Sequence, residues 1–347
     1  MADAEEVESV ETTPANVVVV TKYKMAGYMV NTILKELIAK VKDGVTVLEL
    51  CEFGDRRLSE ETSKVFKKDK EMKKGIAFPT CVSVYNCVCI SPHSNLGAHV
   101  DDYIAVAAHT VVVGASKKNP ITGRKADVII AAQKALGVAL RLVKPGNTNY
   151  ESTDGIQKVT EDFKCKQVEG MLSHQLKQHI IDGQKRKDHE SCEFEVHQVY
   201  AIDILVSFGD GKGRELDTRT TVYKKKDIVY QLKMKASRQF LSETEKKFLL
   251  MPFTLRAFDD ERKAKMGVLE CVKQDLMQPF SVLYEREGEL VAQYKQTVIL
   301  MPNGPLKIKG LPLEEELYKS EYSKEKKAGK AAAESADNAD GEDEAEY

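Results

Sequence analysis

Hydrophobic residues in the first part of the chain repeat with the period of an α-helix. Between residues 22 and 42 they recur every four positions, as Met25, Met29, Ile33, Leu37 and Val41. This spacing places them on one face of a helix, which Leu34 and Ile38 widen. Gly44 is typical of the residue that follows a helix end. The pattern therefore predicts one helix over about residues 22–42 and a second over about residues 47–66.

After residue 80 the pattern changes to strands mixed with helices. Residues 81–88 alternate and are rich in β-branched side chains, which predicts a strand. Further strands are expected at residues 99–113 (one long strand or a hairpin), 199–207, 281–284 and 290–301. Helices are expected at residues 125–143, 152–163, 242–251 and 259–273, the third opened by a capping box at Ser242–Glu245. This order predicts an α+β fold with a mixed, mostly antiparallel sheet flanked by helices.

Composition narrows the class of protein. The 347 residues are 42% hydrophobic and 31% charged, with a formal net charge of −2, so a polyanion would have to be met by local patches. The seven cysteines are scattered along the chain. Cys87 and Cys89 form one close pair, but no second pair follows at the spacing of a zinc site, so buried thiols in a reducing compartment are expected. The acidic N-terminus does not have the pattern of a signal peptide. The sequence contains no run of ~18 apolar residues, so no membrane span is predicted. A soluble intracellular protein is expected.

Both ends of the chain have the composition of disordered segments. Residues 1–16 carry five acids and no apolar periodicity, and residues 321–347 carry four lysines between Lys324 and Lys330 followed by seven acids between Glu334 and Glu346. One folded domain is therefore expected over residues 17–320.

Two residues are candidates for metal chemistry. Asp203 lies inside the apolar strand 199–207, and a buried carboxylate is costly unless it is paired or bound to a metal. Its simplest explanation is a neighbouring Lys, Arg or backbone group, because structural pairs outnumber sites. His174 alone is open to an equally simple explanation as a hydrogen-bonded histidine.

Five motifs turn these observations into a resemblance. They are Gly75-Ile-Ala-Phe-Pro-Thr80, Ser173-His-Gln-Leu-Lys-Gln-His179, Val199-Tyr-Ala-Ile-Asp203, Met251-Pro-Phe-Thr-Leu-Arg256 and Leu300-Met-Pro-Asn-Gly-Pro305. In this order they resemble the proliferation-associated, ErbB-receptor-binding branch of the type-two methionine aminopeptidases, within peptidase family M24. The resemblance runs from about Val17 to Tyr322. It implies the pita-bread aminopeptidase fold, with a helical insert near residues 220–275.

The resemblance also implies which residues stand at the metal-binding positions of that family. Its active members hold two metal ions on two Asp, one His and two Glu, with a bridging water as nucleophile. His174 matches the ligand histidine, and Asp203 stands in place of the first Glu. Val106 stands in place of the second Asp, and Lys295 in place of the last Glu.

The remaining positions of the pattern fall near apparent deletions. The first Asp should precede Leu96, where about a dozen residues of the pattern are absent, and a loop of similar size is absent after Gly183. The substrate-binding histidine should follow Cys89, where Ile90-Ser-Pro-His93 stands instead. At most two of the five ligands remain, so we expect a pseudoenzyme without a metal cofactor, in which Lys295 pairs with Asp203.

Three basic clusters are candidates for binding a polyanion. Residues 64–74 have a net charge of +4 and residues 222–238 a net charge of +5, and a third cluster lies at residues 256–265. Their members are Lys64, Lys67, Lys68, Lys70, Lys73, Lys74, Lys224, Lys225, Lys226, Lys233, Lys235, Arg238, Arg256, Arg262, Lys263 and Lys265. Such density suits phosphate backbones, although ordinary solvated faces explain it equally well.

The resemblance implies that these clusters bind ribosomes and structured RNA, in ribosome biogenesis and in translational and transcriptional control. It also implies protein partners such as receptors or transcription regulators. We expect a monomer in the cytoplasm and nucleus, with nucleoli as a further location. Two alternatives stay open: an active metal-dependent methionine aminopeptidase, and an interaction adaptor that uses the vestigial peptide groove.

Overall fold

A computed structural model describes residues 12–89, 96–171, 173–181, 191–308 and 310–322. The tails at 1–11 and 323–347 and the two apparent deletions, before Leu96 and after Gly183, lie outside the described residues, as does His93. Within them, no helix is long and apolar enough to cross a bilayer.

The central element is an antiparallel sheet whose strands run in the order β1-β3-β4-β14-β8-β6, with β15 on β14 and β7 on β8. Their bounds are β1 Lys74–Phe78, β3 Gly97–Val100, β4 Tyr103–Ala108, β6 Lys166–Gln167, β7 His174–Leu176, β8 Val199–Ser207, β14 Val291–Met301 and β15 Gly304–Lys307. The two long strands, β8 and β14, pair along nine residues, from Val199↔Ile299 to Ser207↔Val291. The expected α+β fold with a mostly antiparallel sheet is confirmed.

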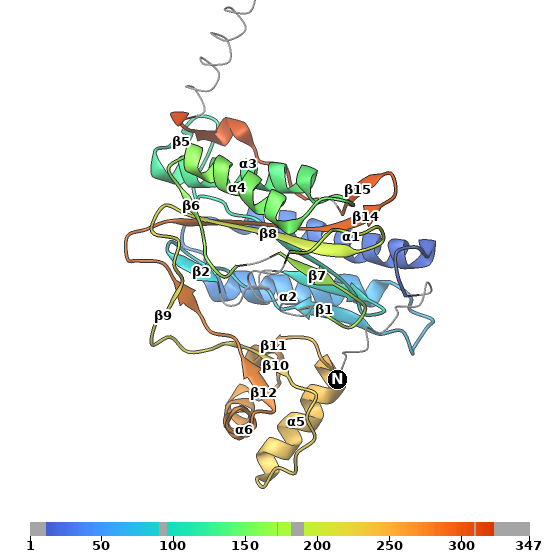
Figure 1. Cartoon of the computed structure of the whole chain (residues 1–347). Helices are drawn as coiled ribbons and strands as arrows, with labels where there is room; N and C mark the ends of the chain where they lie inside the picture. The colour runs from blue at the N-terminus through green and yellow to red at the C-terminus, as the bar shows by residue number, and fades with distance from the viewer. Residues whose placement is uncertain (1–11, 90–95, 172, 182–190, 309, 323–347) are drawn as a thin grey trace, which may run out of the picture.

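Four helices cover the sheet (Figure 1). They are α1 Val17–Lys40, α2 Val47–Lys64, α3 Arg124–Leu142 and α4 Asn149–Asp162. Helix α1 packs on β3 and β4, and α3 packs on β8 and β14. Helix α1 begins five residues earlier than predicted because the Asn16 side chain accepts a hydrogen bond from Val18 N and caps it. Burial of Val19 and Val20 outweighs the weak helix propensity of the valine run.

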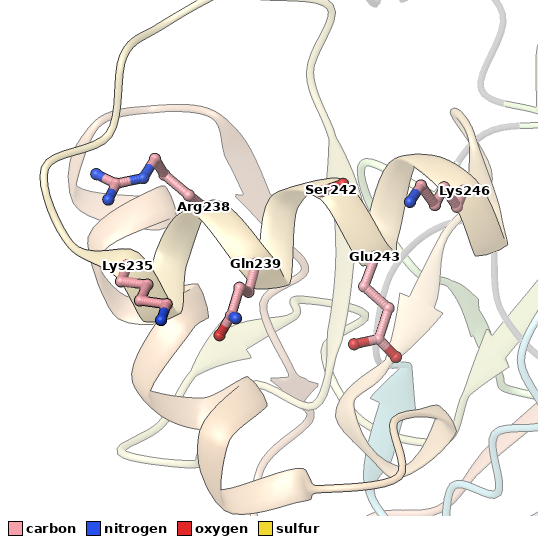
Figure 2. A pocket seen from close by; sticks show the side chains of 6 residues that line it. All are labelled: Lys235, Arg238, Gln239, Ser242, Glu243 and Lys246. Atoms are coloured by element: carbon pink, nitrogen blue, oxygen red, sulfur yellow. The ribbon is translucent and has the colours of Figure 1, made fainter.

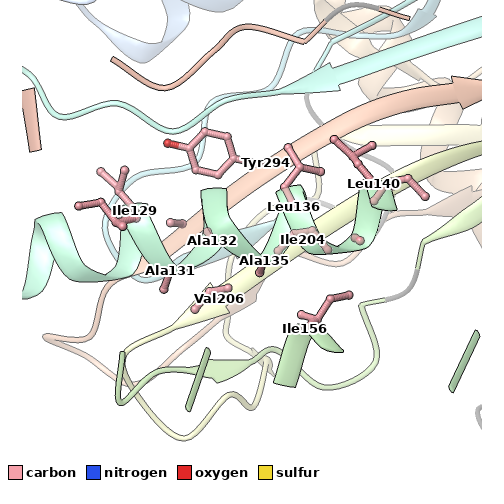
Figure 3. Close-up of a cluster of buried hydrophobic side chains, with 14 of the residues drawn as sticks. Ile129, Ala131, Ala132, Ala135, Leu136, Leu140, Ile156, Ile204, Val206 and Tyr294 are labelled. Carbon is pink, nitrogen blue, oxygen red and sulfur yellow. The ribbon is translucent and has the colours of Figure 1, made fainter. Parts of the chain in front are cut away.

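Alternation along β8 and β14 divides the sheet into two faces. Ile204, Val206 and Tyr294 face α3 and join its Ile129 and Leu136 in one buried cluster (Figure 3). Since neighbouring residues of a strand point to opposite sides, Asp203 and Lys295 belong to the other face. The candidate metal positions therefore lie on the side of the sheet away from α3.

A smaller unit projects from the main body at the bottom of Figure 1. It contains a three-stranded sheet and two helices, with the bounds β10 Val222–Lys225, α5 Lys235–Phe248, β11 Phe253–Thr254, η1 Leu255–Ala257, α6 Glu261–Lys273 and β12 Met277–Pro279. We call residues 222–279 the insert. Its core contains a group of aromatic rings: the Phe248 and Phe253 rings stack with their centroids 4.8 Å apart, and Phe240 and Phe258 lie in the same cluster.

Two local predictions are wrong. Ser242–Glu245 opens no helix, because α5 starts at Lys235 and carries these residues inside it. Residues 81–86 form no strand, because the chain turns there: Tyr85 has a φ of 55°, and Cys87 N donates to Val84 O. Only β2, Cys87–Cys89, is extended, and it pairs with β13, Leu283–Tyr284, which pairs in turn with β9, Arg214–Glu215.

Of the two possibilities predicted for residues 99–113, the structure shows the hairpin, formed by β3 and β4 and joined by Asp101 and Asp102, which both have positive φ. The prediction runs too far, because β4 ends at Ala108 and residues 109–113 are not in a strand. The remaining elements are β5 Ile121–Thr122, η2 Glu315–Leu317 and β16 Tyr318–Lys319. Strands β5 and β16 form a parallel pair beside α3, where the described chain ends.

Candidate functional site: a buried ion pair and a basic insert

A buried ion pair occupies the centre of the sheet face that points away from α3. Lys295 on β14 lies directly opposite Asp203 on β8, and the Lys295 Nζ is 2.7 Å from Asp203 Oδ2. The two side chains are 0% and 1% exposed. The Gln293 Nε2 donates to Asp203 Oδ1 at 2.8 Å. The pairing of Lys295 with Asp203 is confirmed, and the acid in the apolar strand has its cation.

The sheet register brings onto this face four of the five positions that the resemblance assigns to the family's metal site; the fifth precedes Leu96 and lies outside the described residues. Lys295 is also opposite Ala108, so Val106, two residues earlier on β4, shares the face. His174 on β7 is opposite Ala201, two residues before Asp203 on β8. Four adjacent strands therefore supply Val106, Lys295, Asp203 and His174 to two neighbouring rows of side chains.

The chemistry of these side chains does not fit a two-metal cluster. Val106 has no donor atom, is 2% exposed, and packs in an apolar cluster with Phe78, Ala201 and Phe280. Lys295 brings a positive charge to the position where a carboxylate would bridge two dications, which repels them. Within the part of the chain that the structure describes, no group of three His, Cys, Asp or Glu side chains is placed to hold a metal ion.

Burial and pairing act on Asp203 in opposite directions. Burial raises the pKa of the Asp203 carboxyl, and the Lys295 ammonium and the Gln293 amide oppose this by stabilising the charged form. The Asp203 backbone N–H donates to Ser173 Oγ at 3.0 Å, which ties β8 to the residue before His174. The pair thus places one internal cation at the position where the resemblance puts the metal ions of active family members.

A second buried carboxylate was not found from the sequence. Asp102, whose side chain is 2% exposed, lies 2.8 Å from His179 Nδ1 and 3.1 Å from His99 Nδ1. Burial raises the pKa of Asp102, but the His99 hydrogen bond and the nearby positive charges outweigh it, so the pKa is lowered overall. The contact ties the loop after His174 to the β3–β4 hairpin. The only sequence signal was the Asp-Asp turn between two apolar runs.

Many of the predicted RNA-binding residues have partners within the chain. Lys64, Lys225, Lys226, Lys263 and Lys265 form ion pairs with Glu61, Glu245, Asp275, Asp260 and Glu261, respectively. Lys73 lies 3.9 Å from Asp102, Lys74 donates to Val65 O, and Arg238 donates to Leu232 O and Lys233 O. Lys224 is half-buried, and the exposed members include Lys67, Lys68, Lys70, Lys233, Lys235, Arg238 and Arg262.

Arg256 is an interior strut of the fold. Its guanidinium bonds to Asp55 Oδ2 at 2.8 Å and to Thr80 O at 2.7 Å, which joins the insert to α2 and to the end of β1. Burial lowers the pKa of Arg256, and the Asp55 carboxylate more than offsets this. These contacts assign Arg256 to the structure of the domain, which is a different role from the phosphate contact expected for it.

The outer side of α5 carries a continuous polar ridge (Figure 2). Lys235, Arg238, Gln239, Ser242, Glu243 and Lys246 line a shallow groove of about 520 Å³ along it. We call these six residues the α5 ridge. Three of them are cations and one is an acid, so the ridge is positive. Sequence reasoning missed Lys246, because it lies outside the densest charge run.

Comparison with known proteins identifies the family and the fold of the chain. Residues 21–223 match the metallopeptidase family M24. The chain belongs to this family, and the pita-bread fold expected from its motifs is confirmed.

Among relatives, the chain is 46% identical over 323 residues to ERBB-3 binding protein 1 of Arabidopsis thaliana, covering 86% of this chain and 81% of that protein. It is 36% identical over 331 residues to the curved DNA-binding protein of Schizosaccharomyces pombe, covering 87% and 86%. Its resemblance to the ErbB-binding branch is confirmed.

Two solved structures have a similar fold. A thermophilic Arx1 superposes with a TM-score of 0.79 at 27% identity, covering 88% of this chain and 95% of that one. The methionine aminopeptidase of Thermotoga maritima superposes with a TM-score of 0.53 at 16% identity over 84% of this chain and 97% of that one, which shows the shared fold alone.

Proposed function

We propose that this protein is a non-catalytic member of family M24 that binds structured RNA on the ribosome through its insert. The observation that carries the proposal is the α5 ridge: Lys235, Arg238 and Lys246 lie on one exposed helix side after the internal ion pairs of the insert have been accounted for. Growth control, ribosome biogenesis and regulation of translation and transcription, in the cytoplasm and nucleus, belong to the same proposal.

The absence of catalysis follows from the donor set. A hydrolytic two-metal site needs carboxylates that bridge both ions, and Val106 and Lys295 stand where two of the five ligands would be. The buried Lys295–Asp203 pair would have to break before a dication could reach Asp203. Each partner would then be a buried unpaired charge. Metal binding would therefore have to offset the free energy of breaking a buried ion pair, on the order of several kcal/mol.

The ridge has the shape of a phosphate-backbone contact. Lys235 and Lys246 are eleven residues apart on α5, and at about 1.5 Å per residue they are about 16 Å apart along the helix axis. Cations spaced in this way meet several phosphates of one strand, and they read no base sequence. Lys233 and Arg262, exposed elsewhere on the insert, extend the positive surface. A relative named as a DNA-binding protein supports nucleic acid as the class of partner.

Charge reversal on the ridge tests the proposal. The variant Lys235→Glu/Arg238→Glu/Lys246→Glu should lose at least about tenfold in affinity for ribosomal RNA at low salt, with a smaller salt dependence. The control is Lys158→Glu/Lys166→Glu, which reverses two exposed lysines outside the insert, on α4 and β6, and should bind as the wild type does. Equal binding of all three proteins would refute the role of the ridge.

The salt dependence separates RNA binding from the adaptor alternative. Phosphate contacts release counterions, so RNA affinity should fall steeply between about 50 and about 200 mM salt. Apolar docking of a protein in the vestigial groove would change little over that range.

A further inference from the structure

Helix α6 exposes apolar side chains on the side opposite its packed face. Met266 is 60% exposed and Leu269 is 71% exposed. Arg262 and Lys273, also exposed, lie four residues before Met266 and four after Leu269. With 3.6 residues per turn, these positions follow one another along one side of the helix over about 16 Å. We call Arg262, Met266, Leu269 and Lys273 the α6 outer face.

The packed face of α6 holds the helix firmly in the insert. Ala264, Gly267, Val268 and Cys271 are buried there. Gly267 allows a very close approach to α5, since a Cβ at this position would lie 2.5 Å from the Phe240 Cβ. The outer face is therefore a preformed platform, and turning α6 to bury Met266 and Leu269 would break this contact.

The segment before α5 enlarges the apolar surface beside α6. The backbone N–H groups of Lys233 and Met234 donate to the Glu270 carboxylate at 3.3 and 3.4 Å, next to Leu269 in the sequence. Met234 is 47% exposed. At the other end of this segment Lys226 pairs with Asp275, just after α6, and Val229 between the two ties is fully exposed.

Phosphate binding accounts for the cations of this surface but not for its apolar residues. Methionine, leucine and valine at these exposures gain nothing from a phosphate backbone, and clustered exposed apolar residues mark protein contacts. Methionine in particular adapts to varied apolar partners. Arg262 and Lys273 place one cation at each end of the α6 outer face, and the neighbouring acids Asp260 and Glu261 are paired with Lys263 and Lys265. The complementary partner is therefore negative at the two positions that meet Arg262 and Lys273.

We propose that the α6 outer face is a docking site for an amphipathic, acid-flanked helix of a partner protein. Leucine-type side chains of that helix, at i and i+3 or i+4, pack on Met266 and Leu269. Carboxylates about eleven residues apart on the same helix reach Arg262 and Lys273. This site is distinct from the α5 ridge and does not depend on the RNA-binding proposal.

A synthetic peptide tests the site on the full-length protein. The probe is a fluorescent helical peptide of about 16 residues with a leucine stripe and glutamates at both ends, and its control has lysines in place of those glutamates. The acidic peptide should bind saturably, with a Kd on the order of 10–100 μM, and the basic peptide at least about tenfold more weakly.

Two variants divide the contributions. Met266→Ser/Leu269→Ser should weaken the acidic peptide at least about tenfold, and Arg262→Glu/Lys273→Glu should reverse the preference between the two peptides. The control Tyr28→Ser removes a side chain 66% exposed on α1 and should bind as the wild type does. Circular dichroism and the thermal midpoint confirm that each variant is folded.

Four outcomes would overturn the proposal. The first is equal binding of acidic and basic peptides by the wild type, and the second is unchanged binding by both double variants. The third is a concentration-dependent dimer that Leu269→Ser abolishes, since the face would then be an interface between copies of this chain. If Met266→Ser/Leu269→Ser instead lowers RNA affinity and leaves peptide binding unchanged, the surface belongs to RNA, which also refutes the proposal.

Discussion

Replacing Lys295 by methionine removes the cation from the centre of the sheet and leaves Asp203 in place. The Asp203 side chain is 1% exposed, so water cannot replace the lost partner. Its remaining contacts are the Gln293 amide on the carboxylate and Ser173 on the backbone N–H. Removing one partner of a buried pair costs about 3–5 kcal/mol, because an uncompensated charge is left inside the protein.

Protonation of Asp203 limits this cost and makes it depend on pH. Without Lys295 only burial and the Gln293 amide act strongly on the carboxyl, so its pKa in the folded variant should rise further. An acid with a raised folded-state pKa loses stability as pH rises from its unfolded value of about 4 to its folded value. The deficit of Lys295→Met should therefore be larger at about pH 8 than at about pH 5.

The assay is denaturant unfolding of the wild type, of Lys295→Met and of a third protein, each at about pH 5 and about pH 8. The third protein is Lys295→Met/Asp203→Leu, which replaces both charges with apolar groups and should recover the stability to within about 1 kcal/mol of the wild type. The reasoning is refuted if Lys295→Met costs less than about 1 kcal/mol at pH 8, if its deficit does not change with pH, or if the double variant is no better than the single one.

Three further predictions concern other parts of the molecule. Asp102→Asn should flatten the loss of stability on acidification: the lowered pKa of Asp102 gives stabilisation above about pH 4 that disappears as pH falls through the folded-state value, and acid titration followed by fluorescence measures it. Gly267→Ala should destabilise the insert by about 1–3 kcal/mol, since the added Cβ meets Phe240, and hydrogen exchange of α5 and α6 should report it locally. The wild type should release no N-terminal methionine from a short peptide with Co²⁺ or Mn²⁺, and metal-dependent turnover that survives repurification would contradict the non-catalytic assignment.

The long regular elements could be predicted from local pattern, because their periodicity is set by the core they pack against. The strand at residues 199–207 has the predicted bounds, and α3 begins and ends within one residue of its prediction. The prediction of a strand at residues 81–88 was wrong, because the alternation of apolar and polar residues contains no information about the turn that forms there. Tyr85 adopts a positive φ, and Asn86 Nδ2 is held by Glu285 O, which is 199 residues away in the chain.

The candidate site divides in the same way. Pairing of Lys295 with Asp203 was predictable because both residues occupy known positions of a family pattern. Some lysines have an acidic partner one helical turn away, as Lys265 has Glu261, and this spacing could have removed them from the predicted RNA-binding set. The contacts of Arg256 with Asp55 and of Asp102 with His179 could not have been predicted, since only the folded chain brings these residues together.

Sedimentation with purified ribosomes at two salt concentrations tests the central claim most directly. The protein should co-sediment at about 50 mM salt and largely dissociate at about 200 mM, and Lys235→Glu/Arg238→Glu/Lys246→Glu should fail to co-sediment where Lys158→Glu/Lys166→Glu binds normally. Co-sedimentation of the ridge variant equal to that of the wild type, unchanged between the two salt concentrations, would contradict the account.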